Sequence, residues 1–340
     1  MTATLDSPAV AAAPVLDPPP ATAPVPRDLE AVRRKALLRF ATSISVLTLV
    51  GHVFLGFEQM PLVPLVALPT AYVVNLLLET VDAWAFRRPA GYRGGPRALF
   101  YFLLPAHIAA LACSMLIYAD NLLPYLFATT LAISSKYVLR IPSRGRMKHF
   151  LNPSNGGIAI TLLLLPQVGF TPPYMFLNNT DGPLDVLIPL GVLMAGTMLN
   201  AKLTRKMPLI LAWVGGYVLQ AVVRSVFLGD NVLAALQMMT GVAFVLFTNY
   251  MITDPSTTPV TRRGQVLFGF ATAATYGLLV SLGVSYAIFF ALSLVCLGRG
   301  ASLAWTSVRH RLARTEQRPL GRVGEPTTTP GRDPQPAGLA

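Results

Sequence analysis

Charged residues, cysteine and histidine are all scarce in this 340-residue chain. Only 12% of its residues are charged, against about a quarter in soluble domains. It has two cysteines, Cys113 and Cys296, and each stands alone in an apolar stretch. Isolated cysteines exclude the paired spacing of a zinc site and cannot by themselves hold an iron–sulfur cluster. We therefore predict no metal site and expect both thiols to be small core groups.

The four histidines limit the choice of cofactor further. His52 and His107 fall within long apolar stretches, where two imidazoles from neighbouring helices could ligate a haem. The interpretation that we favour is that each imidazole bonds a backbone carbonyl one turn back along its own helix. Haem ligation is the alternative.

Apolar sequence is what the chain has in abundance. It is 53% hydrophobic, with a mean hydropathy of +0.55, and its stretches without charge are long enough to cross a bilayer. A soluble fold is therefore excluded. A window of about 19 residues predicts an all-α polytopic membrane protein with about ten transmembrane helices in two related halves. The predicted helices are residues 37–57, 60–79, 98–118, 121–139, 155–170, 184–200, 208–227, 232–251, 265–282 and 284–298.

The two ends of the chain differ from its middle. Residues 1–32 are rich in Ala and Pro, and residues 301–340 are basic and rich in Pro. Neither segment can bury enough apolar surface to offset the entropy cost of ordering it, so we predict two mostly disordered tails. The membrane domain is predicted to cover residues 33–300.

Positive charge alternates along the chain in step with the predicted helices. If the amino terminus is cytoplasmic and the chain crosses ten times, every Lys and Arg except Arg224 falls on the cytoplasmic side. The positive-inside rule therefore predicts a multi-pass cell-membrane protein with both termini in the cytoplasm. The net charge of +12 is expected to attract anionic lipid headgroups. No base-stacking or groove-reading pattern accompanies it, so nucleic acid is not an expected partner.

Two polar motifs that contain proline stand beside the apolar stretches. In each motif Asn or Asp precedes Pro and then Ser, which is typical of an N-cap followed by proline at the first helical position. A helix start of this kind offers backbone N–H groups to an anion, a phosphate or a polarised carbonyl. We predict that the motifs share one non-covalent ligand site on the cytoplasmic side. Its residues would be Asn152, Ser154, Asn155, Gly156, Thr253, Asp254, Thr257 and Arg263.

A plainer alternative is that both motifs only cap helices at the membrane surface. The similarity of Asn152-Pro153-Ser154 to Asp254-Pro255-Ser256 suggests an internal duplication, although three matched positions do not prove one. Asp254 distinguishes the two hypotheses, because a carboxylate near membrane depth costs several kcal/mol unless it is paired or functional. Its nearest expected cationic partners are Arg262 and Arg263, or Lys136 and Arg140.

The second motif and the helix after it resemble the NqrB/RnfD family of membrane subunits. The resemblance rests on Thr253-Asp254-Pro255, a turn rich in Thr and Ser, and Arg263-Gly264, with Asn152-Pro153-Ser154-Asn155 similar to the family's first motif. It extends loosely over residues 36–300. Within that family the chain resembles the UnbU-type proteins encoded in enediyne biosynthesis clusters. The features concerned are Lys136-Tyr137, Arg140, Leu164-Leu165-Pro166 and Thr171-Pro172-Pro173-Tyr174.

This resemblance implies electron transfer linked to a flavin or quinone. Family members with covalent flavin attach it through a threonine in a long external connection. The corresponding connection here is short, and its best candidate, Thr180, lacks the Ala-Thr context. The implied cofactor is therefore a non-covalent flavin, FMN or riboflavin. The implied partners are soluble redox or biosynthetic enzymes on the cytoplasmic face.

Three classes of function remain open from the sequence. The first is an electron-transfer component of enediyne biosynthesis, which would be a redox subunit without catalysis of its own. The second is a transporter of a small molecule or ion that confers self-resistance, which broken helices meeting at a central site would favour. The third is a membrane anchor for biosynthetic enzymes, which the basic cytoplasmic face would suit.

Overall fold

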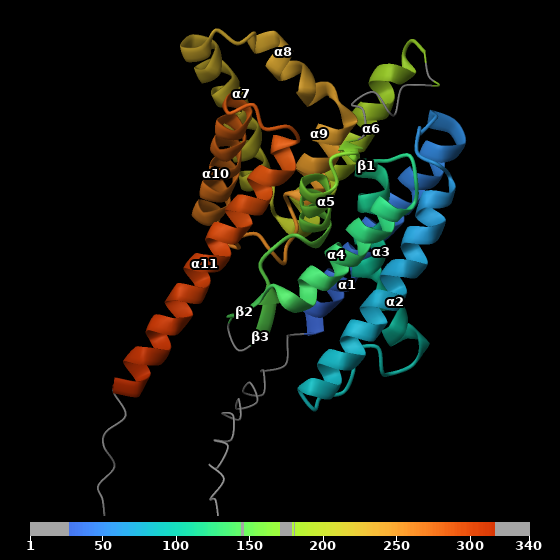
Figure 1. Cartoon of the computed structure of the whole chain (residues 1–340), viewed down its shortest axis with the longest axis vertical. Helices are drawn as coiled ribbons and strands as arrows, with labels where there is room; N and C mark the ends of the chain where they lie inside the picture. The colour runs from blue at the N-terminus through green and yellow to red at the C-terminus, as the bar shows by residue number, and fades with distance from the viewer. Residues whose placement is uncertain (1–26, 144–145, 171–178, 180, 317–340) are drawn as a thin grey trace, which may run out of the picture.

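The structure, a computed structural model, describes residues 27–316 except 144–145, 171–178 and 180. It is a bundle of helices, as predicted (Figure 1). The first part contains α1 (Arg27–Val50), which continues as a π-helical turn η1 (Gly51–Leu55), then α2 (Leu62–Ala85), α3 (Pro96–Leu116) and α4 (Leu123–Val138). Two short antiparallel strand pairs accompany them. Strand β1 (Ile117–Tyr118) pairs with β4 (Gly169–Phe170), and β2 (Arg140–Ser143) pairs with β3 (Arg146–His149).

The second part begins with the short helix α5 (Pro153–Leu164). It continues with α6 (Leu184–Leu199), the π-helical turn η2 (Asn200–Thr204) and α7 (Met207–Leu228). An interrupted segment follows, made of α8 (Val232–Gln237), η3 (Met238–Thr240), α9 (Val242–Leu246) and η4 (Phe247–Met251). The last two helices are α10 (Arg262–Ser281) and α11 (Ala287–Glu316).

Seven helices in the described residues are long and apolar enough to cross a membrane. The multi-pass, all-α prediction is thus confirmed, and the count of ten is approximate. The other three predicted spans are the 16-residue α4, the 12-residue α5 and the interrupted α8–η4 segment. The terminal helices also extend beyond the predicted 33–300 limits, since α1 begins at Arg27 and α11 ends at Glu316.

Two predicted helices were wrong in detail, and local backbone chemistry explains both. The helix predicted over 155–170 ends at Leu164, because Pro166 disfavours helical dihedrals at Leu165, which has φ −118° and ψ 89°. The helix predicted over 232–251 is broken at Gly241. That residue is extended, with φ −72° and ψ 138°, and glycine is a poor helix former. Both interruptions bring irregular backbone into the interior of the bundle.

One end of the bundle gathers the connections that carry acidic residues. Strand β1 follows α3 and pairs with β4, which follows α5. A Cβ on Gly56, between α1 and α2, would lie 2.7 Å from the side chain of Asn179, which precedes α6. Arg224, the basic residue that the charge pattern leaves on this side, forms an ion pair with Asp230. The exception to the charge pattern is thus locally neutralised.

The opposite end gathers the basic connections, at the lower side of Figure 1 where β2 and β3 lie. Arg88, which follows α2, and Arg140 in β2 share the carboxylate of Asp82. Lys206, before α7, donates to the Pro259 carbonyl at 2.7 Å. Arg299 of α11 donates to the Thr257 carbonyl at 2.6 Å. Basic and acidic connections therefore lie at opposite ends of the bundle.

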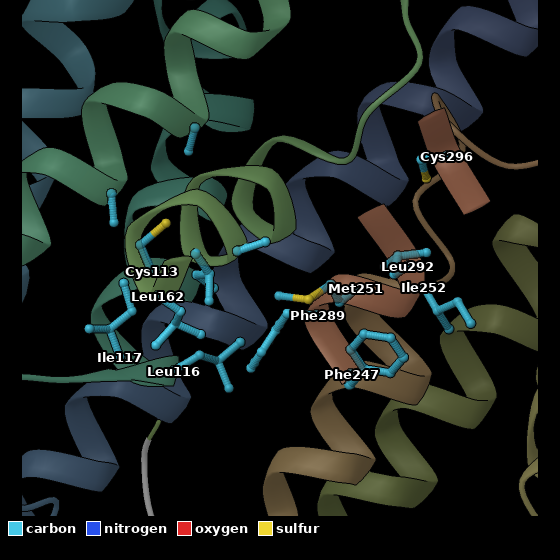
Figure 2. Packing of buried hydrophobic residues seen from close by; sticks show 14 of the residues in the cluster. Cys113, Leu116, Ile117, Leu162, Phe247, Met251, Ile252, Phe289, Leu292 and Cys296 are labelled. Atoms are coloured by element: carbon cyan, nitrogen blue, oxygen red, sulfur yellow. The ribbon is translucent and has the colours of Figure 1, made fainter. Parts of the chain in front are cut away.

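Small residues let the central helices approach closely. A Cβ on Gly157 of α5 would clash with the Ala128 carbonyl of α4 and would lie 2.8 Å from the Ala132 side chain. Figure 2 shows apolar side chains of α3 and α5 meeting those of η4 and α11 in the same core. Cys113 and Cys296 are both fully buried there, as expected for small core groups.

Candidate functional site

A hydrogen bond joins the first proline motif to the residue just before the second. Asn152 is the N-cap of α5, and its Oδ1 accepts the N–H of Asn155 at 3.0 Å. Its amide nitrogen is left to donate across the bundle to the Met251 carbonyl at 2.9 Å. Met251 ends η4, three residues before Asp254. The first motif is therefore bonded to the residue that precedes the second, and a ligand site shared by the two stays a prediction.

The second motif does not begin a helix, and that prediction was wrong. Residues 254–258 form a turn, in which Asp254 Oδ1 accepts the Ser256 N–H at 3.0 Å and Oδ2 accepts the Thr257 hydroxyl at 3.1 Å. Pro259 follows at once, and a proline inside a helix removes a hydrogen bond and clashes with the preceding turn. The next helix, α10, begins at Arg262 with Thr261 as its N-cap.

The remaining predicted site residues divide between the protein interior and its surface. Asn155 is fully buried and donates to the Phe289 carbonyl at 3.0 Å and to the Ser293 hydroxyl at 2.8 Å, both in α11. Thr253 is buried and donates to the Asn249 carbonyl. Gly156 is buried against Leu151. Arg263 is exposed at the start of α10, away from this cluster, and Thr180 lies outside the described residues.

Of the four cationic partners predicted for Asp254, the structure supports Lys136, and it adds Lys206. Arg262 and Arg263 are exposed, and Arg140 pairs with Asp82. Asp254 instead interacts electrostatically with Lys136, one of the predicted partners, and with Lys206. Lys206 is only 4% exposed, and its burial lowers the pKa of its ammonium group to about 8.

A second polar cluster beside the motifs was missed by the sequence analysis. Glu79 and Asp82 project from the last turns of α2 and are almost fully buried. Arg88 bridges the two carboxylates, and Glu79 also accepts the Gly91 N–H at 2.7 Å. The pattern of two acidic residues one turn apart, followed by arginine, is visible in the sequence. The second predicted span ends at residue 79, which leaves Asp82 in a connection.

An aromatic cavity of about 240 Å³ lies beyond the motifs, toward the acidic end. Half of the fourteen residues that line it are aromatic, and none of the described lining residues is charged. Tyr217, Phe244 and Tyr276 of this wall form an aromatic cluster with Trp213, in stacked and edge-to-face contacts with ring centroids 4.8–6.2 Å apart. The aromatic lining residues are Phe170, Tyr217, Phe244, Phe247, Tyr276, Tyr286 and Phe289.

The motif residues hold the wall of this cavity from behind. Asn155 bonds the backbone of Phe289, and Asn152 bonds the end of η4, the turn that begins with Phe247. The Phe247 and Phe289 rings meet edge to face 6.4 Å apart, and both are labelled in Figure 2. Asn155 Oδ1 is buried and has no hydrogen-bond partner within the part of the chain that the structure describes. It is an unused acceptor between motif and cavity.

Ser154 lines a different and smaller cavity. This space of about 50 Å³ lies between α1, α3 and η4, and Tyr250 and Met251 also border it. Ser154 is the one predicted site residue in its lining. Among the described residues, none of the predicted site residues lines the larger, aromatic cavity. No local motif could have revealed that cavity, because its aromatic residues are spread from position 170 to position 289.

The charge pattern, the two motifs and the interrupted helices can now be set beside known proteins. Residues 128–297, half of the chain, match the NQR2, RnfD, RnfE family. The matched region contains both motifs and all residues that line the aromatic cavity. No curated protein matches the chain. The match agrees with the resemblance seen in the motifs, and the chain belongs to the NQR2, RnfD, RnfE family.

Proposed function

We propose that this protein is a membrane electron-transfer subunit that holds a planar, uncharged redox ring in the aromatic cavity without a covalent bond. Family membership supports a membrane subunit of an electron-transport complex. The observation that carries the finer proposal is the cavity itself. Its volume of about 240 Å³ is slightly below the roughly 300–1,000 Å³ typical of small-molecule sites.

The lining indicates the class of ligand. Aromatic side chains prefer offset or edge-to-face contact with another ring, so a flavin or a quinone suits this wall. A phosphate would be buried here without a cation, and burying an unpaired charge is costly. The cavity therefore favours riboflavin or a quinone over FMN. Such a ring supplies the ability to accept and release electrons, which the side chains of the cavity lack.

The two motifs have a positioning role in this proposal. Asn152 and Asn155 fix the backbone segments that carry Phe247 and Phe289, so the motifs set the width of the cavity from its buried side. Asp254 balances Lys136 and Lys206 at the same junction. In a cell whose metabolite production depends on this protein, Asp254→Asn and Asn155→Ala should abolish production of that metabolite, while membrane insertion and protein level change little. Asp181→Asn, the same substitution at an exposed position before α6, is the matched control. Normal product formation by a well-expressed Asp254→Asn variant would contradict this role.

The resemblance to UnbU-type proteins extends the proposal to enediyne biosynthesis. In that setting the electrons would pass to or from a soluble enzyme docked on the basic face, where the Lys and Arg connections lie. Deletion of the gene in an enediyne-producing strain should stop product formation, and the unmodified gene should restore it. An unchanged yield after deletion would separate this protein from the pathway.

Ligand binding can be tested on the purified protein. Riboflavin and a short-chain quinone are each titrated into detergent-solubilised Trp84→Phe/Trp305→Phe protein, in which Trp213 is the one remaining tryptophan, while its fluorescence is recorded. The Trp213 ring packs against Phe244 and Tyr276 of the lining. We expect saturable quenching by one of them. Val280→Phe, which places a ring in the cavity, should abolish the quenching, and Leu278→Phe on the exposed side of α10 should leave it unchanged.

Two outcomes would overturn the proposal. One is the absence of saturable quenching by either ring. The other is quenching that survives Val280→Phe, which would place the ligand elsewhere. In-gel fluorescence of the denatured protein tests the bond type. A fluorescent band that disappears in Thr180→Val would show a covalent flavin, whereas we expect no band. Transport of a solute by reconstituted protein that binds neither ring would favour the transporter alternative.

A further inference from the structure

His107 takes part in a chain of hydrogen bonds that joins three membrane helices. Its Nε2 lies 2.7 Å from the Ser45 hydroxyl of α1, and its Nδ1 lies 2.6 Å from the Tyr72 hydroxyl of α2. The Tyr72 and His107 rings are also nearly parallel, with centroids 6.2 Å apart. The expected bond to a carbonyl one turn back is made by His52, whose Nδ1 lies 2.8 Å from the Thr48 carbonyl. That prediction was wrong for His107, because hydroxyl groups on two neighbouring helices reach its ring.

The direction of these bonds follows from the proton count. The single Ser45 hydroxyl proton is donated to the Ala41 carbonyl at 2.7 Å, so the Ser45 oxygen must accept from His107 Nε2–H. A neutral imidazole then has an unprotonated Nδ1, which accepts the Tyr72 hydroxyl proton. The chain runs from Tyr72 through His107 to Ser45, and its bond from Tyr72 to Nδ1 requires a neutral ring.

The chain lies near the middle of each membrane span. Ser45, Tyr72 and His107 are central in the spans Arg34–Leu55, Leu62–Ala85 and Pro96–Leu116. No charged side chain of the described residues interacts with His107. Tyr72 is the titratable group that α2 presents to it, and Ser45 is the polar group from α1. α4 contributes Ile133 to the adjoining core, together with the titratable Tyr137, whose hydroxyl donates to Asn75. An ionisable group at this depth is a functional candidate by default.

We propose that Ser45, His107 and Tyr72 form a proton-controlled junction between α1, α2 and α3. With His107 neutral, the ring links α1 to α2 through α3. A proton on Nδ1 converts that nitrogen from an acceptor to a donor, so the Tyr72 oxygen must accept from it. The Tyr72 hydroxyl proton then has to turn away and has no other acceptor among the described residues. The reversed bond leaves that hydroxyl proton unpaired inside the membrane domain, which costs free energy and favours a different position of α2 against α1 and α3.

Movement at this junction has a route to the proline motifs. Ile44 and Ile108, the chain neighbours of Ser45 and His107, line the cavity of about 50 Å³ whose far wall contains Ser154 and Met251. α1 therefore borders free space on the side that faces the motifs, and it is held by the junction on the adjacent side. A change in the protonation of His107 would alter the helix that bounds this cavity.

The test measures the separation of α1 and α2 as the pH changes. Spin labels are attached at Leu49→Cys and Leu77→Cys, two positions that are 65% and 61% exposed, and their distance distribution is recorded at pH 8 and pH 5. The native cysteines are buried, and protein without the introduced cysteines controls for labelling of them. We expect the distribution to shift at pH 5. His107→Gln, which keeps one donor and one acceptor but cannot be protonated, should give the pH 8 distribution at both pH values.

Tyr72→Phe should give the pH 5 distribution at both pH values, because it lacks the hydroxyl whose donation to Nδ1 is ended by the proton. Histidine ¹⁵N NMR of the otherwise unaltered protein should show His107 gaining a proton over the same pH range. That measurement keeps the proposal testable even where His107→Gln fails to insert. The proposal is overturned if the distribution is the same at pH 5 and pH 8, if His107→Gln shifts as much as the unaltered protein, or if His107 remains neutral at pH 5.

Discussion

The side-chain amide of Asn152 both caps α5 and links α5 to η4, and the two contributions can be separated experimentally. Its oxygen caps α5, while its nitrogen crosses to Met251 in a segment 99 residues away. Asn231 is a natural comparison, because it caps α8 in the same way, through the Ala234 N–H, but is exposed. The pair distinguishes a local cap from a link across the bundle.

We predict that Asn152→Ala destabilises the protein more than Asn231→Ala does. Loss of an N-cap costs about 1 kcal/mol, and a lost internal hydrogen bond adds about 1 kcal/mol. We therefore expect a cost of about 2 kcal/mol for Asn152→Ala and about 1 kcal/mol or less for Asn231→Ala. Thermal unfolding of the detergent-solubilised variants measures both. Equal costs would mean that the bond to Met251 contributes nothing.

Lys206 should make the free energy of unfolding vary with pH in the alkaline range. Burial holds its pKa at about 8 in the folded protein, below the 10.5 of an exposed lysine. Between these values the unfolded chain binds more protons, so the stability of the folded state rises with pH, by up to about 1.4 kcal/mol per pH unit. The unfavourable contribution is fully present below about pH 8.

Lys206→Met should remove this dependence. We expect the difference in unfolding free energy between Lys206→Met and the unaltered protein to change between pH 8 and pH 10, and to stay constant below pH 8. Lys202→Met is the matched control, because Lys202 is exposed in the same connection. If both variants show the same pH profile as the unaltered protein, Lys206 is not the group responsible.

At the scale of the elements, the packing of α5 on α4 depends on the absence of a side chain at Gly157. A Cβ there would meet the backbone of Ala128 and the side chain of Ala132, and a backbone atom cannot swing away as a flexible side chain can. Gly215 in α7 is helical too, but a Cβ at that position would have nothing within 4 Å of it. The same substitution should therefore have opposite effects at the two sites.

We predict that Gly157→Ala destabilises the protein by about 1–3 kcal/mol, the usual cost of overpacking. Gly215→Ala should instead stabilise α7 by about 0.5–1 kcal/mol, because alanine favours the helix. Chemical or thermal unfolding of the two variants in the same detergent provides the comparison. A neutral result for Gly157→Ala would show that α4 and α5 separate easily, and would weaken the positioning role given to Asn152.

The long helices were predictable because hydropathy reports directly on lipid contact, and α3, α7 and α10 follow the predicted spans closely. The π-helical turns η2 and η4 were not predictable, since they depend on side chains such as Asn200, which donates to the Asn249 carbonyl at 2.7 Å from a different helix. Contacts of this kind decide backbone geometry only after the helices have packed.

In the candidate site, too, local features could be predicted from the sequence and features that depend on packing could not. Asn152 could be recognised as a cap because capping involves only nearby residues, and the structure confirms it. The helix expected at Pro255 does not form, because the Asp254 side chain stabilises a turn and Pro259 prevents the helix from continuing. The aromatic cavity has no sequence signal, since Phe170, Tyr217 and Phe289 become neighbours only in the folded bundle.

For the whole molecule, the separation of charge between the two ends gives a prediction of orientation. The connections with Arg88, Arg140 and Lys206 lie at one end, together with Arg299 of α11. The connections with Asp120 and Asp230 lie at the other end. Their separation arises from the fold itself and does not depend on a membrane. The positive-inside rule then assigns the basic end to the cytoplasm.

We predict that topology reporters fused after Gly91 and Arg262 report the cytoplasm, and that fusions after Asp120, Asn179 and Asp230 report the external side. Gly91 is held by Glu79 beside the Arg88 cluster, whereas Asn179 lies against Gly56 at the opposite end. The Asn179 fusion is the most informative, because it depends on the 12-residue α5 crossing between the two ends. A cytoplasmic signal at Asn179 would contradict the ten-crossing arrangement. A uniform reversal at all five positions would keep the arrangement and invert it in the membrane, which would place the proline motifs and their lysines on the external side.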